Sequence, residues 1–166
     1  MARKSLPKPP AAVVLDRLGL AYELVSYDPG PLLSAEETAL ILGRPPETVF
    51  KTLLVRGDVT GPLEVCLPAG REAELKTLAK ATGNKKISLS SVRELTELTG
   101  FQRGGCSPLG GRKSFPVWLD QSILSLDRVL INAGRRGQML ILDPRDLQKA
   151  ARASLADLVR PEHLPG

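Results

Sequence analysis

Lys51 interrupts a strand pattern that is otherwise apolar. It lies in the segment 48–56, where alternation puts apolar side chains on both faces of the predicted strand. An ammonium group in such a strand must pair with a carboxylate, reach water at an edge, or lose its proton because burial lowers its pKa. Positions that break their local pattern are often functional. Lys51 is therefore either an active-site cation or a lysine whose stem lines the sheet and whose head pairs at the surface.

The segment 104–111 reads Gly-Gly-Cys-Ser-Pro-Leu-Gly-Gly. Glycines permit positive φ and let successive N–H groups face one concavity, which can bind a carbonyl oxygen, an oxyanion or a phosphate. The alternative is a loop that is merely mobile. The chain has neither the phosphate-binding G-x-x-x-x-G-K-[ST] loop nor the dinucleotide motif G-x-G-x-x-G, so we expect no ATP, NAD or other cofactor.

The single histidine, His163, limits the chemistry further because it falls in a proline-rich tail. A Ser–His–Asp triad, a Cys–His pair or a histidine zinc site would have to recruit it, so we expect catalysis without histidine. Cys106 as a nucleophile would need a lowered pKa, and a spectator role is the simpler interpretation. Cys66, 40 residues away, is expected to be a small buried residue. Two such cysteines favour no metal site and a reducing, cytoplasmic setting.

The chain is basic, with 23 lysines and arginines against 18 acidic residues and a net charge of +5. This charge attracts polyanions, although a solvated basic surface would look the same. Aromatic residues make up only 4%, which argues against an aromatic platform for single-stranded nucleic acid. Basic residues recur beside loops, at Lys85-Lys86, Arg103, Arg112-Lys113 and Arg135-Arg136, and would suit phosphate contacts if those loops share one face.

Helices and strands must position these groups. Segments with helical periodicity are interspersed along the chain with segments that alternate as strands do. We expect helices at 11–18, 35–42, 71–82, 92–99 and 146–152, and strands at 22–27, 48–56, 63–67, 117–119, 128–132 and 138–142. Capping boxes begin two of the helices, at Ser34 with Glu37 and at Ser91 with Glu94. Hairpins rather than regular βαβ units predict one mixed α/β domain over residues 1–166, with a curled mixed sheet surrounded by helices. Residues 1–10 and 161–166 are expected to be frayed, and neither a membrane span nor a signal peptide is expected.

Four motifs in order resemble those of the YbaK family. They are Phe50-Lys51-Thr52-Leu53-Leu54, Thr99-Gly100-Phe101, the segment 104–110, and Gly134-Arg135-Arg136-Gly137. The family comprises freestanding trans-editing deacylases related to the editing domain of bacterial prolyl-tRNA synthetases. The resemblance covers residues 13–159. Each motif alone is weak, and their combination is fairly specific.

The resemblance implies hydrolysis of the ester between a wrong amino acid and tRNA, chiefly Cys-tRNA(Pro). In the family, the thiol of the substrate cysteine attacks the ester carbonyl and expels tRNA as a thiolactone forms. Prolyl-tRNA synthetase is an implied partner, and a monomer is expected. The site residues are expected to be Lys51 and Gly104 for catalysis; Tyr27, Thr52, Gly105, Cys106, Ser107, Pro108 and Asn132 for substrate binding; and Arg103, Arg112, Lys113, Arg135 and Arg136 for tRNA binding.

Two positions depart from the family pattern. Family members usually have serine at the position of Asn132 and an aliphatic residue at that of Cys106, and both are expected to face the amino-acid pocket. Thr52 favours the YbaK-like branch over the alanine-specific branch, which tends to carry asparagine there. Three alternatives remain: a deacylase for alanine or serine on tRNA, a non-catalytic module that binds tRNA or a synthetase, and a hydrolase of small esters or thioesters.

Overall fold

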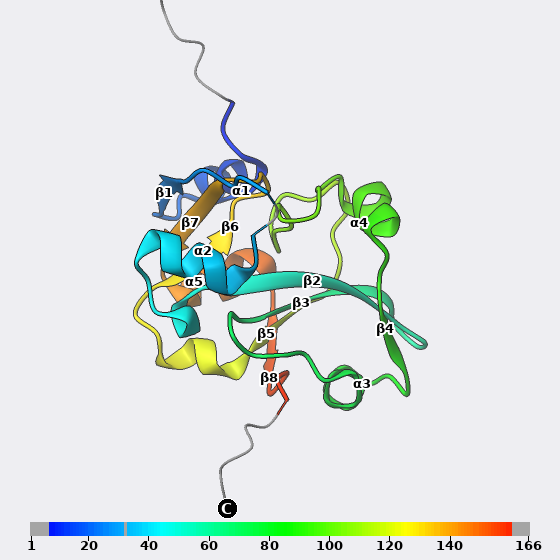
Figure 1. Cartoon of the computed structure of the whole chain (residues 1–166). Helices are drawn as coiled ribbons and strands as arrows, with labels where there is room; N and C mark the ends of the chain where they lie inside the picture. The colour runs from blue at the N-terminus through cyan, green and yellow to red at the C-terminus, as the bar shows by residue number, and fades with distance from the viewer. Residues whose placement is uncertain (1–6, 32, 161–166) are drawn as a thin grey trace, which may run out of the picture.

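Two long strands, β2 (Phe50–Gly57) and β3 (Gly61–Pro68), form an antiparallel hairpin at the centre of the fold (Figure 1). The computed structural model describes residues 7–31 and 33–160 of the chain. The hairpin belongs to a five-stranded sheet of order β4-β2-β3-β5-β8. Its other strands are β4 (Ile87–Leu89), β5 (Val117–Asp120) and β8 (Ser154–Ala156). The β3–β5 and β5–β8 pairs are parallel, whereas β2 is antiparallel to both of its neighbours.

A second sheet of three strands meets the first near the start of β2. Its order is β1-β7-β6, all antiparallel, with β1 (Glu23–Ser26), β7 (Gln138–Leu142) and β6 (Val129–Asn132). An isolated parallel bridge between Val49 and Leu130 joins the two sheets. Phe50 and Cys66 from the large sheet pack in one buried core with Ile131 from the small sheet. The first residues of β2 therefore lie at the junction of the sheets.

Helices surround both sheets, and their ends carry capping residues of the kinds that the sequence predicts. They are α1 (Pro10–Leu18), α2 (Ala35–Leu42), α3 (Leu75–Thr82), α4 (Val92–Thr99) and α5 (Pro144–Ala151), with 3₁₀ turns η1 (Pro46–Thr48) and η2 (Gln121–Ser125). The predicted capping box at Ser34 and Glu37 is present, and α2 ends at Gly43 in a left-handed conformation. Ser91 caps α4 by accepting a hydrogen bond from the Glu94 amide. In the part of the chain that the structure describes, no helix is long and apolar enough to cross a membrane.

The mixed α/β class is confirmed, while several local predictions need correction. The predicted helix 71–82 begins only at Leu75, because residues before it are extended and Ala73 forms an antiparallel bridge with Val159. The predicted strand 48–56 begins at Phe50, after the 3₁₀ turn η1. Strands β4 and β8, of three residues each, were not predicted. The parallel pairs made by β5 also differ from the expected hairpins.

The predicted frayed segment 1–10 extends too far into the chain. Pro10 is the first residue of α1, and Lys8 forms an ion pair with Asp16 at 2.6 Å. The carbonyl oxygen of Pro7 accepts a hydrogen bond of 2.7 Å from Arg135. Residues 7–10 are therefore held against the domain. The other predicted tail, with His163, lies outside the described residues.

Gly110 packs against the start of α1 so closely that a side chain would not fit. Its φ is +83°, and a Cβ built there would lie 2.6 Å from the carbonyl carbon of Pro10. We predict that Gly110→Ala lowers the free energy of unfolding by about 3 kcal/mol, through strain at positive φ and a backbone clash. Gly43→Ala is the matched control, since Gly43 also has positive φ but nothing within 4 Å of the built Cβ. Urea denaturation would contradict the packing argument if both variants lost the same amount.

Candidate active site

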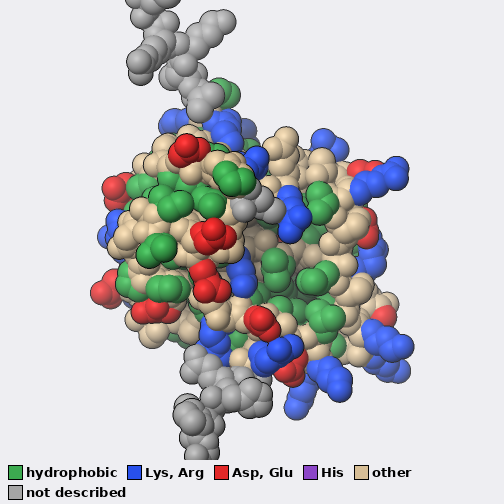
Figure 2. Space-filling view, viewed as in Figure 1, with side chains coloured by type: hydrophobic (Ala, Val, Ile, Leu, Met, Phe, Trp, Pro, Cys, Tyr) green, Lys and Arg blue, Asp and Glu red, His purple; other side chains and the backbone are tan. Residues whose placement is uncertain are grey.

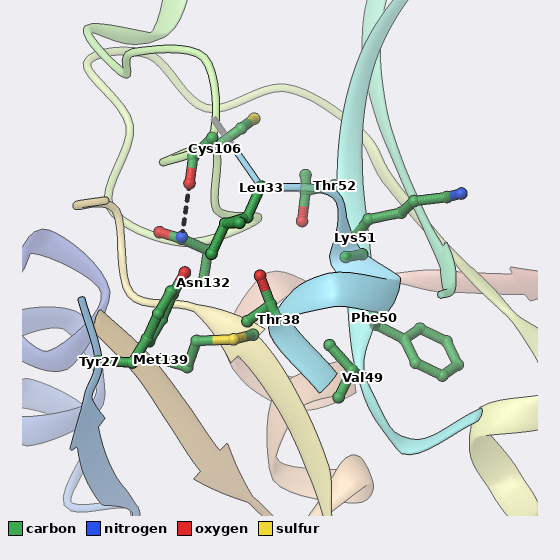
Figure 3. Close-up of a pocket in the computed structure, with 12 residues that line it drawn as sticks. Tyr27, Leu33, Thr38, Val49, Phe50, Lys51, Thr52, Cys106, Asn132 and Met139 are labelled. Carbon is green, nitrogen blue, oxygen red and sulfur yellow. Dashed lines mark hydrogen bonds between the residues drawn. The ribbon is translucent and has the colours of Figure 1, made fainter. Parts of the chain in front are cut away.

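A small cavity lies between the start of β2, the first turn of α2, the small sheet and the glycine-rich segment (Figure 3). Its volume is about 160 Å³. A cavity of about 150 Å³ accommodates benzene, so this one can hold a small side chain but not a nucleotide. Its lining residues are Tyr27, Leu33, Ala35, Thr38, Val49, Phe50, Lys51, Thr52, Gly104, Cys106, Asn132 and Met139.

Six of the predicted catalytic and substrate-binding residues lie together in this lining. They are Tyr27, Lys51, Thr52, Gly104, Cys106 and Asn132. Gly105, Ser107 and Pro108 are buried and do not line the cavity. Ser107 is fully buried, and its hydroxyl accepts a hydrogen bond from the Leu109 amide, which gives it a structural role in the loop.

Asn132 fastens the glycine-rich segment to the small sheet. Its Nδ2 donates to the Gly104 carbonyl oxygen at 2.9 Å, and its Oδ1 accepts from the amides of Gly134 at 2.8 Å and Arg135 at 3.1 Å (Figure 3). One side chain therefore fixes both the loop edge of the cavity and the turn that follows β6. A serine could not span both partners, because it has one donor and a shorter reach.

One amide of the predicted nest, that of Gly105, has a partner within the loop. The Gly105 amide donates to the Gln102 carbonyl oxygen at 2.9 Å within a turn, and the Gly104 carbonyl oxygen points toward Asn132. Gly104 has a φ of +85°, which favours glycine there. The Gly105 amide is therefore engaged within the loop and does not join the nest.

The ammonium group of Lys51 points away from the cavity. In Figure 3 the side chain extends from β2 in the direction opposite to Tyr27 and Asn132, and it also lines a neighbouring hollow with Leu53 and Glu72. Burial lowers the pKa of Lys51, while the charges of Glu36 and Glu72 oppose that shift. Lys51 is half-buried at the rim, with no ion pair within 4 Å among the described residues.

A buried carboxyl group beneath Cys106 was not predicted. Glu64 of β3 is 5% exposed, and its Oε2 accepts a hydrogen bond from the Cys106 thiol at 3.8 Å. Next along the same face of β3, the thiol of Cys66 lies 3.4 Å from the Thr52 hydroxyl. Like Lys51, Glu64 is a charged residue in an otherwise apolar strand. The pattern that singles out Lys51 in the sequence could therefore have singled out Glu64 as well.

Burial sets the protonation of this cluster. It raises the pKa of Glu64 to about 7 and that of Cys66 to about 12, and it also raises the pKa of Cys106. Both thiols therefore stay protonated at neutral pH, which disfavours Cys106 as a nucleophile because the thiolate is the reactive form. Within the described ranges 7–31 and 33–160, no group of three or more His, Cys, Asp or Glu side chains could hold a metal ion.

Most of the predicted tRNA-binding cations are engaged within the protein. Arg112 donates to the Glu97 carbonyl oxygen, Arg135 to that of Pro7, and Arg136 to that of Gly30. Arg103 and Lys113, in contrast, have no hydrogen-bond or ion-pair partner among the residues that the structure describes. Arg103 lines a groove that adjoins the cavity.

The buried Glu64 makes stability depend on pH. Its pKa is about 7 in the folded chain against an ordinary value of 4.5, so the folded state binds the proton more tightly than the unfolded state. The resulting stability is present below pH 4.5 and is lost as pH rises through about 7. We predict that Glu64→Gln, which stays neutral, gains on the order of 3 kcal/mol relative to wild type between pH 4.5 and pH 8. Guanidinium denaturation at several pH values checks this, and parallel stability curves would contradict it.

Comparison with known proteins assigns the chain to a family. Residues 30–150 match the family model of the aminoacyl-tRNA editing domain. EbsC of Enterococcus faecalis, to which Cys-tRNA(Pro)/Cys-tRNA(Cys) deacylase activity is attributed, is 38% identical over 130 residues, which cover 78% of this chain and 79% of EbsC. The prolyl-tRNA editing protein ProX of Acetoanaerobium sticklandii is 25% identical over 146 residues, 84% of this chain and 87% of ProX.

The fold is similar to that of a solved structure described as a trans-editing enzyme for prolyl-tRNA synthetase. The TM-score is 0.83 at 24% identity, and the match covers 95% of this chain and all of the other. At that identity the likeness concerns the fold alone. The sequence match and the fold agree, and the chain belongs to the aminoacyl-tRNA editing domain family.

Proposed function

We propose that this chain hydrolyses mischarged aminoacyl-tRNA, with Cys-tRNA(Pro) as its main substrate. The observation that carries the proposal is the small cavity in which Tyr27, Thr52, Cys106 and Asn132 converge. Its volume of about 160 Å³ admits the side chain of cysteine, alanine or serine and excludes a nucleotide. The similarity to EbsC, at 38% identity, favours cysteine among these.

The reaction uses the reactivity of the substrate itself. The cysteinyl thiol attacks the ester carbonyl carbon, a C–S bond forms, the C–O bond to the ribose breaks, and the thiol proton passes to the leaving ribose oxygen. Water then opens the thiolactone. The chain's part is to hold the thiol and the carbonyl in the attacking geometry, which alone can supply a large rate gain. This route needs neither histidine nor a protein nucleophile.

Lys51 acts at the rim of the cavity, according to this proposal. Because its ammonium group points away from Asn132, it would meet the ribose or the adjacent phosphate and not the carbonyl carbon. A cation there orients the substrate and stabilises charge that develops on the leaving oxygen. Lys51 is therefore a positioning cation, and it does not serve as the general base.

The test is hydrolysis of Cys-, Ala- and Ser-tRNA(Pro) by the purified protein. We predict that Cys-tRNA(Pro) loses its amino acid fastest and that Lys51→Ala lowers kcat/KM at least about tenfold, because a charge contact near the leaving group is lost. Lys80→Ala is the control, since Lys80 is exposed in the last turn of α3.

Other outcomes separate the alternatives. Faster loss of alanine or serine would reassign the amino acid while leaving the reaction in place. Binding of tRNA without hydrolysis above the buffer rate would indicate a non-catalytic module. Full activity of Lys51→Ala would refute the role given to the lysine. Added prolyl-tRNA synthetase should raise the rate if that enzyme delivers the tRNA.

A further inference from the structure

Cys106 connects the cavity to a carboxyl group behind its wall. The Cys106 side chain lines the cavity, and its thiol donates to Oε2 of Glu64 at 3.8 Å. Glu64 itself is 5% exposed and is not among the described residues that line the cavity. Glu64 therefore reaches a molecule in the cavity only through the sulfur atom of Cys106.

The described residues of the cavity wall include no other group that readily takes up a proton. Figure 2 shows apolar side chains gathered around the hollow in the middle of this face. No aspartate, glutamate or histidine is among the described lining residues, and the charged one is Lys51, whose ammonium group points away. The hydroxyl groups of Tyr27, Thr38 and Thr52 accept hydrogen bonds, but a neutral hydroxyl does not hold a second proton. A proton that leaves a molecule in the cavity is therefore best taken up through Cys106.

The reaction proposed above needs an acceptor for the thiol proton. A cysteinyl thiol has an ordinary pKa of about 8.5, and the thiolate is the form that attacks a carbonyl carbon. At neutral pH most of the substrate thiol is protonated, so a group that takes its proton raises the rate. Because Cys106 donates its own proton to Glu64, its sulfur presents lone pairs to the cavity. The substrate thiol can donate to that sulfur, whereas the methyl group of alanine cannot.

The surroundings of Glu64 suit it to the far end of such a route. Its partners in register, Leu54 of β2 and Val117 of β5, are apolar. The titratable groups that interact with it are the thiols of Cys106 and Cys66. Burial raises the pKa of Glu64 to about 7, so its carboxylate form is present above neutral pH and holds a proton more firmly than an ordinary carboxylate. A pKa near the working pH favours proton transfer.

We propose that Cys106 and Glu64 form a proton relay for the substrate thiol. The inference rests on the proposed function, because it needs a cysteinyl ester in the cavity. As the substrate sulfur bonds to the carbonyl carbon, its proton passes to the sulfur of Cys106, and the Cys106 proton passes to the carboxylate of Glu64.

The proton then returns along the same route to the ribose oxygen as the C–O bond breaks. The substrate sulfur and the ribose oxygen are bound to the same carbon atom in the intermediate, so the sulfur of Cys106 can serve both. The thiolactone and free tRNA leave, and Cys106 and Glu64 end in the protonation states in which they began. Cys106 contacts the substrate in this scheme, and Glu64 acts through it.

The first test is the pH profile of Glu64→Gln, which keeps the side-chain volume but cannot take up the proton. For wild type we expect kcat/KM on Cys-tRNA(Pro) to rise with pH through about 7, as Glu64 ionises. We expect the variant to lack this rise, to be at least about tenfold slower at pH 7.5, and to approach wild type near pH 9, where the substrate thiol ionises unaided. A purely structural role would lower the rate equally at every pH, so parallel profiles would overturn the relay.

The second test removes the thiol that carries the proton. We expect Cys106→Ala to give the same profile as Glu64→Gln, the double variant to be no slower than either single one, and Cys106→Ser to recover part of the rate through its hydroxyl group. Cys66→Ala is the control, because Cys66 is also a buried thiol on β3 but does not line the cavity, and it should keep the wild-type profile. Losses that add in the double variant, or a serine variant as slow as the alanine one, would contradict the relay.

The third test does not depend on catalysis. The carboxyl carbon of Glu64, labelled with ¹³C and assigned by its loss in Glu64→Gln, is titrated with pH in the presence of the cysteine amide or the alanine amide of 3′-amino-3′-deoxyadenosine. A thiol that donates to Cys106 strengthens the hydrogen bond to the carboxylate, so we expect the cysteine amide to lower the pKa of Glu64 relative to the alanine amide. The same pKa with both amides would overturn the relay even if the protein deacylates Cys-tRNA(Pro). A lowered pKa without hydrolysis would instead count against the proposed function.

Discussion

The hydrogen bonds of Asn132 are the interaction on which the site depends. Leu109 of the glycine-rich segment packs in the core and Cys106 donates to Glu64, while Asn132 fixes the Gly104 carbonyl oxygen from the end of β6. The same side chain closes the following turn through the amides of Gly134 and Arg135. Without this tie, the Gly104 edge of the cavity would lose its link to β6, and a site that works by positioning depends on such links.

The junction between the two sheets explains why the cavity lies where it does. β2 enters the large sheet directly after Val49 bridges to Leu130 of the small sheet, so the sheets diverge from this point. Phe50 packs in the core between them and also lines the cavity. Two of the basic residues have structural roles, since Arg135 and Arg136 donate to the backbone carbonyl oxygens of Pro7 and Gly30.

Much of this arrangement could be predicted from local sequence. Alternation predicts that Lys51 and Thr52 lie on opposite faces of β2. In the structure, the ammonium group of Lys51 points away from the cavity, and the Thr52 hydroxyl lies beside Cys66. The capping box at Ser34 predicts α2. The division into two sheets could not be predicted, because it depends on pairing between β1 and β7, which are more than 100 residues apart. The contact of Glu64 with Cys106 likewise joins distant segments.

The most direct test of the central claim is a crystal structure with a non-hydrolysable substrate analogue, the cysteine amide of 3′-amino-3′-deoxyadenosine. The account predicts that the cysteinyl group occupies the cavity between Tyr27 and Cys106, with its carbonyl group beside the glycine-rich segment and Asn132 still bound to Gly104. A cysteinyl group bound in the hollow formed by Glu72 and Leu75, with the cavity empty, would contradict the account.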